Sequence, residues 1–330
     1  MNTLYPLKFE PILKDLIWGG NKLRTLLNKE EASDKCGESW EISDVEGNSS
    51  VVVNGFLAGN TLNELVEIYM GDLMGDAVYE KFNNEFPLLI KFIDANDKLS
   101  IQVHPDDEMA AEEHGGKGKT EMWYVMDAAP DSEIIVGFNK KTDKETYVKL
   151  LNENKLIEIL NFEKVKPGDV FFLPAGRIHA IGSGLLVAEI QQTSNFTYRI
   201  FDWNRTDAQG NPRELHTELA LKAMDFTYHK NSKTEYVEKK NDAVNLVDCP
   251  YFTTNLISFE KSIVRDYFNF DSFIIYICLE GSIKVNAETC EPIELKKGES
   301  ILIPAVFKNI ELVPNSFSKI MEVYISENGN

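Results

Sequence analysis

The stretch LSIQVHPDDEMAAEEHGGKGKTE, residues 99–121, carries three potential metal ligands within one short segment. Residues two apart in a β-strand point to the same face of the strand. Gln102 and His104 can therefore face one pocket, while the apolar residues that alternate with them face a core. Glu121 stands at the far end of the stretch and begins the strand-like run EMWYVM.

A second run, GDVFFLPAGRIHAIG at residues 168–182, supplies His179 at the end of an apolar strand. We expect Gln102, His104, Glu121 and His179 to hold one metal ion in the mouth of a β-barrel. The alternative is that the two histidines are hydrogen-bonded core residues; the spacing QVH, the run PAGRIH and a lysine beside the glutamate favour the metal. Nitrogen and oxygen donors without a thiolate suit zinc in an open catalytic site, and also manganese, iron or cobalt.

Composition limits the classes of protein that the chain can belong to. Its 330 residues are enough for two domains with sizeable cores. A net charge of -19 argues against nucleic acid or an anionic membrane as partner. It does not exclude a phosphorylated substrate, because a pocket can be locally positive and salt screens remote charges over about 8 Å.

Targeting and cysteine patterns indicate a cytoplasmic protein. No window approaches the roughly 20 apolar residues of a membrane span, and the first residues, MNTLYPLKFEP, lack a signal-peptide pattern. The four cysteines show no CxxC or framework spacing, so we expect them to be reduced and structural. We expect a monomer or a homodimer.

Three helical insertions are expected in the first part of the chain, at about 62–82, 142–160 and 213–224. Thr61 and Glu64 form a capping-box pattern at the start of the first one. The composition turns polar near residues 229–240, which we interpret as a linker. The predicted domains are therefore residues 1–235 and 236–330.

The second part of the chain repeats the first. GDVFFLPA, residues 168–175, aligns with GESILIPA, residues 298–305, and this alignment places His179 opposite Asn309. All five histidines lie at or before position 229, so the second copy cannot rebuild the site. We predict a mainly β protein of two barrels of short strands, with helical insertions in the first barrel and without metal ligands in the second.

These features resemble the cupin jelly roll and, more specifically, the short bacterial form of type I phosphomannose isomerase. The matching segments are IWGG (17–20), GESWEIS (37–43), LSIQVHPDD (99–107), GKTEMWY (118–124), PGDVFFLPAGRIHAIG (167–182), TYRIFDWNR (197–205) and RELHTELAL (213–221). They span nearly the whole first domain. The interval of 17 residues from His104 to Glu121 also fits this family, whereas an ordinary cupin places its glutamate only a few residues after the histidines.

The resemblance implies metal ligation by His104, Glu121 and His179, with Gln102 as a fourth ligand, and one Zn²⁺ per chain. It implies that Arg199 is catalytic. Lys119, Glu189 and Arg205 take positions that carry Lys, Glu and Lys near the substrate in longer relatives. Arg205 keeps the charge of that lysine, but a guanidinium is not a plausible proton carrier, which favours a phosphate-binding or charge-stabilising role.

The implied reaction interconverts mannose 6-phosphate and fructose 6-phosphate through a cis-enediol intermediate. Lys119, Glu189 or a hydroxide on the metal could carry the proton. Arg177, Lys119 or Arg205 could hold the phosphate group.

Two alternatives are a metal-dependent cupin oxygenase and a non-catalytic sugar-phosphate-binding bicupin. The segments GKTE and TYRIFDWNR carry lysine and arginine, which suit a phosphorylated sugar and have no role in an oxygenase. A protein that only binds the sugar phosphate would be expected to lack one of the metal ligands or Arg199, and all of them are present.

Overall fold

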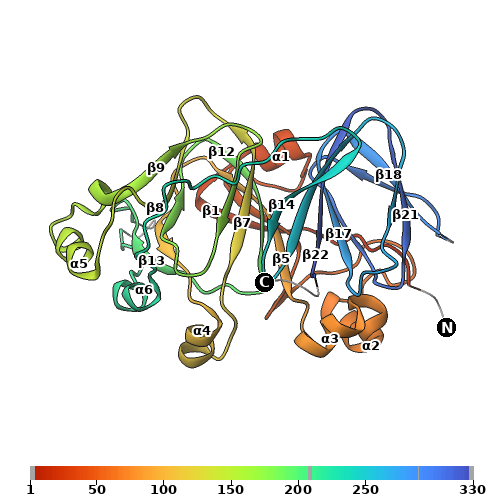
Figure 1. Ribbon diagram of the computed structural model, residues 1–330, viewed down its shortest axis with the longest axis horizontal. Coiled ribbons are helices and arrows are strands. Elements are labelled where there is room, and N and C mark those ends of the chain that lie inside the picture. Colours follow the sequence, from red (N-terminus) through yellow and green to blue (C-terminus); the bar gives the residue numbers. More distant parts are fainter. Residues whose placement is uncertain (1–3, 207–209, 289, 327–330) are drawn as a thin grey trace.

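The computed structural model describes residues 4–206, 210–288 and 290–326, and β-strands form most of its regular structure. The strands form two sandwiches that lie side by side, with most helices at the edges of the molecule (Figure 1). The prediction of a mainly β protein with two cupin-type barrels is confirmed.

The first sandwich has two sheets in which neighbouring strands run antiparallel. One sheet contains, in spatial order, β1 (Ile12–Gly20), β2 (Cys36–Ile42), β5 (Leu88–Ala95), β12 (Leu185–Gln192), β7 (Glu121–Ala128) and β10 (Val170–Leu173). The other contains β13 (Tyr198–Phe201), β6 (Ile101–Val103), β11 (His179–Ile181), β8 (Glu133–Phe138) and β9 (Leu160–Lys164). Trp123, Val187 and Val136 belong to one buried apolar cluster, which fills the space between the sheets.

The second sandwich also has two antiparallel sheets. One contains β14 (Asp242–Asp248), β15 (Thr253–Phe259), β22 (Ser318–Tyr324), β17 (Ile274–Glu280) and β20 (Ser300–Ile303). The other contains β16 (Ile263–Asp266), β21 (Asn309–Pro314), β18 (Ser282–Ala287) and β19 (Ile293–Lys296). A separate ribbon pairs β3 (Asp44–Val45) with β4 (Asn48–Ser49).

The two sandwiches repeat the same topology. The order β5-β12-β7-β10 corresponds to β15-β22-β17-β20, and β6-β11-β8-β9 corresponds to β16-β21-β18-β19. His179 pairs with Gln102 in the first sandwich, and Ile310 pairs with Arg265 in the second. β11 begins at His179, five residues after Pro174, and β21 begins at Asn309, five residues after Pro304, so the two loops have the same length, as the aligned repeat predicts. The side chain of Asn309 is exposed, and the next residue, Ile310, is buried.

The first insertion forms two helices, α2 (Leu62–Met74) and α3 (Asp76–Phe82). The side chain of Thr61 accepts a hydrogen bond from the Glu64 amide, and Glu64 accepts one from the Thr61 amide, so the expected capping box is present. Gly75 separates the helices with a φ of 93°, and a β-carbon there would lie 2.3 Å from the carbonyl oxygen of Asp271. Both helices lie against the second sandwich (Figure 1).

The other helices are short. They are α1 (Lys22–Leu27), α4 (Asp107–His114), α5 (Lys144–Asn152), α6 (Thr217–Ala223) and a 3₁₀ turn at Leu156–Ile159. Asp106 and Asp143 cap α4 and α5 by accepting hydrogen bonds from backbone amides. The expected helix 213–224 begins only at Thr217, because the preceding residues bond to β13: the His216 amide donates to the Arg199 carbonyl oxygen over 2.7 Å.

One large apolar core extends across both halves of the chain. Leu7 forms an antiparallel bridge with Leu302, with N–H···O distances of 2.8 and 2.9 Å, so the beginning of the chain pairs with β20. The Phe273 amide donates to the Met74 carbonyl oxygen at the end of α2 over 3.1 Å. The division into domains at residues 235 and 236 stays a prediction.

Among the described residues, no helix combines the length and the apolar character that a membrane crossing requires.

Candidate functional site

Three predicted ligands converge inside the first sandwich. His104 follows β6, Glu121 begins β7 and His179 begins β11, and one potential ligand atom of each lies within 4.8 Å of the other two. The His104 Nε2 lies 3.5 Å from Glu121 Oε2, and the His179 Nε2 lies 3.3 Å from Glu121 Oε1. All three side chains are buried.

Backbone carbonyls orient the two imidazoles. His104 Nδ1 lies 2.9 Å from the carbonyl oxygen of Phe196, and His179 Nδ1 lies 2.8 Å from that of Arg177. A carbonyl oxygen only accepts hydrogen bonds, so each Nδ1 carries the proton and each Nε2 presents a lone pair to the site. Metal-binding histidines in proteins are commonly held in this way.

Both histidines are neutral in these surroundings. Burial lowers the pKa of His179 to about 4, and the hydrogen bond to Arg177 opposes this change. Burial, followed by the charge of Lys119, lowers the pKa of His104 well below its usual value. Neutral imidazole is the form that binds a metal ion.

The carboxylate of Glu121 lacks hydrogen bonds within the described part of the chain, although both oxygens are buried. Burial raises the pKa of Glu121 to about 7, against the opposing charge of Lys119. The ammonium of Lys119 lies 3.1 Å from Oε2, whereas Oε1 faces the Nε2 lone pair of His179 at 3.3 Å, a contact between two acceptors that is costly without a cation between them. These residues therefore fit a divalent metal ion, and the donor set is the one expected for an open catalytic site.

Gln102 lies next to this group on β6. Its Nε2 lies 3.3 Å from His179 Nε2, and the Ser100 hydroxyl donates to its Oε1 over 3.3 Å. The two ends of a side-chain amide have almost the same shape. A half-turn of the amide would therefore bring Oε1 to the place where Nε2 now faces His179.

Lys119 also lies in the site. Its Nζ is 3.1 Å from Glu121 Oε2 and 3.2 Å from His104 Nε2, and the residue is 5% exposed. The extended backbone before β7 brings Lys119 and Glu121 to the same cavity, so Lys119 is a buried residue of the site although it precedes the strand.

Glu189 belongs to a buried charge cluster in the neighbouring strands. Lys91 and Trp123 are its register partners on β5 and β7. The Trp123 indole donates to Glu189 Oε2 over 2.7 Å, and Lys91 Nζ lies 3.4 Å from Oε1 and 3.9 Å from Glu38 Oε2. Burial favours a raised pKa for Glu189, but Lys91 and then Lys119 outweigh it, and the pKa falls below its usual value.

Arg199 pairs with Gln102 across β13 and β6. Its NH1 donates to the Glu214 carbonyl oxygen over 2.9 Å, and its amide donates to His216 Nδ1 over 3.2 Å. Within the described residues its buried Nε lacks an acceptor. Burial, followed by the charge of Arg213, lowers the pKa of Arg199, yet an arginine remains charged at any working pH.

Arg205 is bound to its surroundings through all three guanidinium nitrogens. NH1 donates to the Lys98 carbonyl oxygen over 2.6 Å, NH2 to Asp202 Oδ1 over 2.5 Å, and Nε to the Asp202 carbonyl oxygen over 3.3 Å. Arg177, the third residue that we considered for binding the phosphate group, is buried. Burial lowers its pKa, and the negative charge of Asp225 opposes this change.

The site opens into a cavity of about 320 Å³ in the first sandwich, within the size range of small-molecule pockets. Gln102, Lys119, Glu189 and Arg199 line it. The other residues that line it are Leu16, Trp18, Glu38, Lys91, Ile93, Leu99, Ser100, Trp123, Ile181, Asn195, Thr197 and Arg213.

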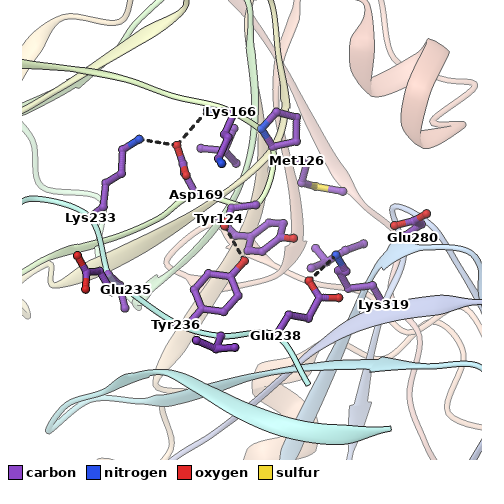
Figure 2. Close-up of a pocket in the computed structure, with 16 residues that line it drawn as sticks. Tyr124, Met126, Lys166, Asp169, Lys233, Glu235, Tyr236, Glu238, Glu280 and Lys319 are labelled. Carbon is purple, nitrogen blue, oxygen red and sulfur yellow. Dashed lines mark hydrogen bonds and ion pairs between the residues drawn. The ribbon is translucent and has the colours of Figure 1, made fainter. Parts of the chain in front are cut away.

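A larger cavity of about 1060 Å³ lies where segment 233–238 passes between β7 and the second sandwich (Figure 2). Two ion pairs lie in its wall: Lys233 with Asp169 at 2.7 Å, and Lys319 with Glu238 at 3.1 Å (Figure 2). None of the predicted site residues lines this cavity.

Sequence reasoning missed three residues that line the smaller cavity: Lys91, Trp123 and Arg213. Lys91 is the one charge inside the apolar run PLLIKFI at residues 87–93, and such a residue in a buried strand indicates a buried partner. Arg213 belongs to the segment RELHTELAL, which we interpreted as a helix and as one of the segments that resemble the family, without a role for its arginine.

Comparisons with known proteins place the chain among sugar-phosphate isomerases. The sequence model of the type I phosphomannose isomerase catalytic domain matches residues 7–139. Mannose-6-phosphate isomerase ManA of Bacillus subtilis is 37% identical over 311 residues, which cover 92% of this chain and 94% of that protein. Mannose-6-phosphate isomerase of Streptococcus mutans is 34% identical over 305 residues, with the same coverage of both chains.

Solved structures show the same arrangement. The crystal structure of mannose 6-phosphate isomerase from Bacillus subtilis superimposes with a TM-score of 0.87 at 32% identity, covering 98% of this chain and 100% of that one. The apo enzyme from Salmonella typhimurium, at 18% identity and a TM-score of 0.77, has the same fold and covers 98% of this chain and 100% of its own. On its sequence identity to these relatives along almost its whole length, the chain belongs to the type I phosphomannose isomerase family.

Proposed function

We propose that this protein is a metal-dependent isomerase that interconverts mannose 6-phosphate and fructose 6-phosphate by moving a proton between C1 and C2. The observation that carries this proposal is the convergence of His104, Glu121 and His179 beside Lys119, in a chain whose relatives are named mannose-6-phosphate isomerases. Neither an oxygenase nor a non-catalytic binder is favoured by these findings.

The two imidazoles and the carboxylate would hold the metal, with the Gln102 amide oxygen as fourth ligand, and we propose one zinc ion per chain. When bound, such an ion polarises the substrate carbonyl as a Lewis acid. The protein's own contribution is to keep both Nε2 lone pairs pointed at one spot through the carbonyls of Phe196 and Arg177.

Arg199 supplies a fixed positive charge for the oxyanion that develops at the substrate during enolisation. Its guanidinium is held from behind by the Glu214 carbonyl oxygen, and its buried Nε is left for another acceptor. Pre-oriented donors of this kind need no reorganisation when the charge appears.

Lys119 is better placed than Glu189 to carry the proton. Its Nζ lies directly beside Glu121 and His104, where the reacting carbons must approach the site. Glu189 instead faces Trp123 and Lys91, which stabilise its anion and weaken it as a base. We assign to Glu189 the role of keeping Lys91 paired inside the cavity wall.

The phosphorylated hexose enters the cavity that Gln102, Lys119 and Arg199 line. The cytoplasmic location and the monomeric or homodimeric state stay predictions.

A coupled assay of fructose 6-phosphate formation tests the proposal, run on the protein as purified, after removal of metal by a chelator, and after return of zinc. We expect activity to be lost with the metal and restored with it. Isomerase activity that persists without metal would contradict the metal mechanism, and a zinc-loaded protein without activity would contradict the function.

A further inference from the structure

Two arginines that follow β13 in the chain bind one carboxylate. Asp202, which is 5% exposed, accepts hydrogen bonds from both Arg205 and Arg213. Arg199, on β13, lines the same cavity as Arg213. Three guanidinium groups thus lie in this part of a protein whose overall charge is -19.

We propose that Arg213, in place of Arg205, is the residue that binds the phosphate group of the substrate, next to Arg199. This inference rests on the function proposed above and names a specificity-determining residue for it. Both Arg199 and Arg213 line the 320 Å³ cavity, together with Gln102 and Lys119 from the candidate metal site.

Arg205 is already bound to the protein through each of its three guanidinium nitrogens. Its three nitrogens donate to the carbonyl oxygens of Lys98 and Asp202 and to the Asp202 carboxylate, and a second carboxylate, Asp97, lies 3.6 Å from NH1. Binding phosphate would require Arg205 to break these bonds, which offsets the gain from the new contact. Arg205 therefore holds the loop in shape.

Arg213 has a different set of contacts. Its Nε donates to Asp202 Oδ2 over 2.7 Å and its NH2 to Asp202 Oδ1 over 2.5 Å, so the carboxylate occupies one edge of the guanidinium. A guanidinium has five N–H groups arranged as forks, and a second edge can bind a phosphate through two parallel hydrogen bonds. Asp202 fixes the plane of this fork before the substrate arrives.

Electrostatics favour an anion between the two arginines. Burial, followed by the like charge of Arg213, lowers the pKa of Arg199. In the cavity wall Lys91, Lys119 and Arg213 each lie against a carboxylate, whereas the guanidinium of Arg199 donates to a backbone carbonyl, which leaves its charge uncompensated by that contact. A phosphate dianion relieves this repulsion, whereas a neutral sugar does not.

The test compares Arg213→Gln with the matched control Arg205→Gln, both loaded with zinc. The measurements are KM and kcat for mannose 6-phosphate, the inhibition constant of inorganic phosphate, and the zinc content. Loss of a charge-assisted bidentate contact should raise KM and the inhibition constant together by about 10- to 100-fold in Arg213→Gln. The kcat and zinc content should stay within about threefold.

The control should keep KM within about threefold of the wild-type value, because Arg205 makes no contact with substrate. A wild-type KM in Arg213→Gln would overturn the proposal, and so would an equal rise of KM in both variants, which would indicate a collapse of the loop around Asp202. If Arg213→Gln does not fold, Arg213→Lys replaces it. The proposal then requires a weaker inhibition by phosphate, since an ammonium cannot form the fork, and an unchanged inhibition constant overturns it.

Failure of the proposed function gives a different result. A zinc-loaded wild type that does not convert mannose 6-phosphate would contradict the function itself. Calorimetric titration with inorganic phosphate still tests the site in that case: heat of binding that is lost in Arg213→Gln supports it, and equal binding to both proteins overturns it.

Discussion

Glu121 carries the strongest single indication of chemistry in this molecule. Both of its oxygens are buried; Lys119 Nζ lies 3.1 Å from Oε2, and Oε1 faces the Nε2 lone pair of His179 at 3.3 Å. Two acceptors that face each other in this way are stable where a cation can lie between them. The position of Glu121 could be predicted from the sequence, since the spacing QVH, the lysine before the glutamate and the run PAGRIH are local features. The Phe196 carbonyl that orients His104 could not be predicted, because every residue has a backbone carbonyl and the sequence does not show where it points.

His179→Ala should lower the zinc content of the purified protein well below one ion per chain, because one of the four expected ligands is removed. Elemental analysis measures this, with competition against a chelator for the affinity. The matched control is His229→Ala, since His229 lies away from the site beside Asp225. Normal zinc stoichiometry in His179→Ala would show that the ligand assignment is incorrect.

Arg199→Ala should keep the zinc and the fold but lower kcat by about 10²- to 10³-fold, the usual effect of removing one donor to a developing oxyanion. Steady-state kinetics at saturating mannose 6-phosphate measure this, with a melting curve as control for folding. A loss of only a few-fold would remove Arg199 from the catalytic group.

At the scale of elements, the register of β5, β12 and β7 places Lys91, Glu189 and Trp123 in one row across the sheet. The alternation of apolar residues predicts each strand but not its neighbours, because pairing in a sheet joins segments about 100 residues apart. The sequence therefore showed that Lys91 is an unusual charge in an apolar strand, but it did not show that Glu189 and Trp123 lie beside it. The start of α6 at Thr217 has a similar cause, since residues before it bond to β13.

Lys91→Met should lower the free energy of unfolding by about 3–5 kcal/mol, because it leaves buried carboxylates without their cation. Lys91 is fully buried and faces Glu189 and Glu38. Urea unfolding of the zinc-loaded protein measures this. Lys14 and Lys91 both lie over the ring of Trp40, so Lys14→Met, which removes the partly exposed lysine of the two, is the control. A cost below about 1 kcal/mol would mean that the cluster is hydrated or protonated.

At the scale of the whole molecule, the two sandwiches differ in what lies between their sheets: the first contains the candidate metal site, and the second contains an ion pair between Arg265 and Glu322. By topology, β16, β17 and β21 correspond to β6, β7 and β11, which carry the candidate ligands of the first sandwich. Arg265 Nε and NH2 donate to Glu322 over 2.8 and 3.0 Å, and the Tyr267 hydroxyl also donates to it. The repeat GESILIPA predicted the second copy, but the ion pair could not be predicted, because Arg265 and Glu322 lie 57 residues apart in the chain.

Glu322→Gln should destabilise the protein by about 3 kcal/mol or more, since it leaves Arg265 without its bidentate partner in a buried network. The zinc content should remain one per chain, because this network lies in the other sandwich. Chemical unfolding and elemental analysis on the same sample measure both quantities. A joint loss of zinc and stability would indicate that the two sandwiches unfold as one unit.

The bridge between Leu7 and Leu302 affects the order of assembly during synthesis. Leu302 is synthesised almost 300 residues after Leu7. At 5–20 residues per second this interval is roughly 15–60 s. Throughout that time an apolar side chain that is fully buried in the finished protein remains open to chaperones, so this part of the fold cannot close until Leu302 has left the ribosome.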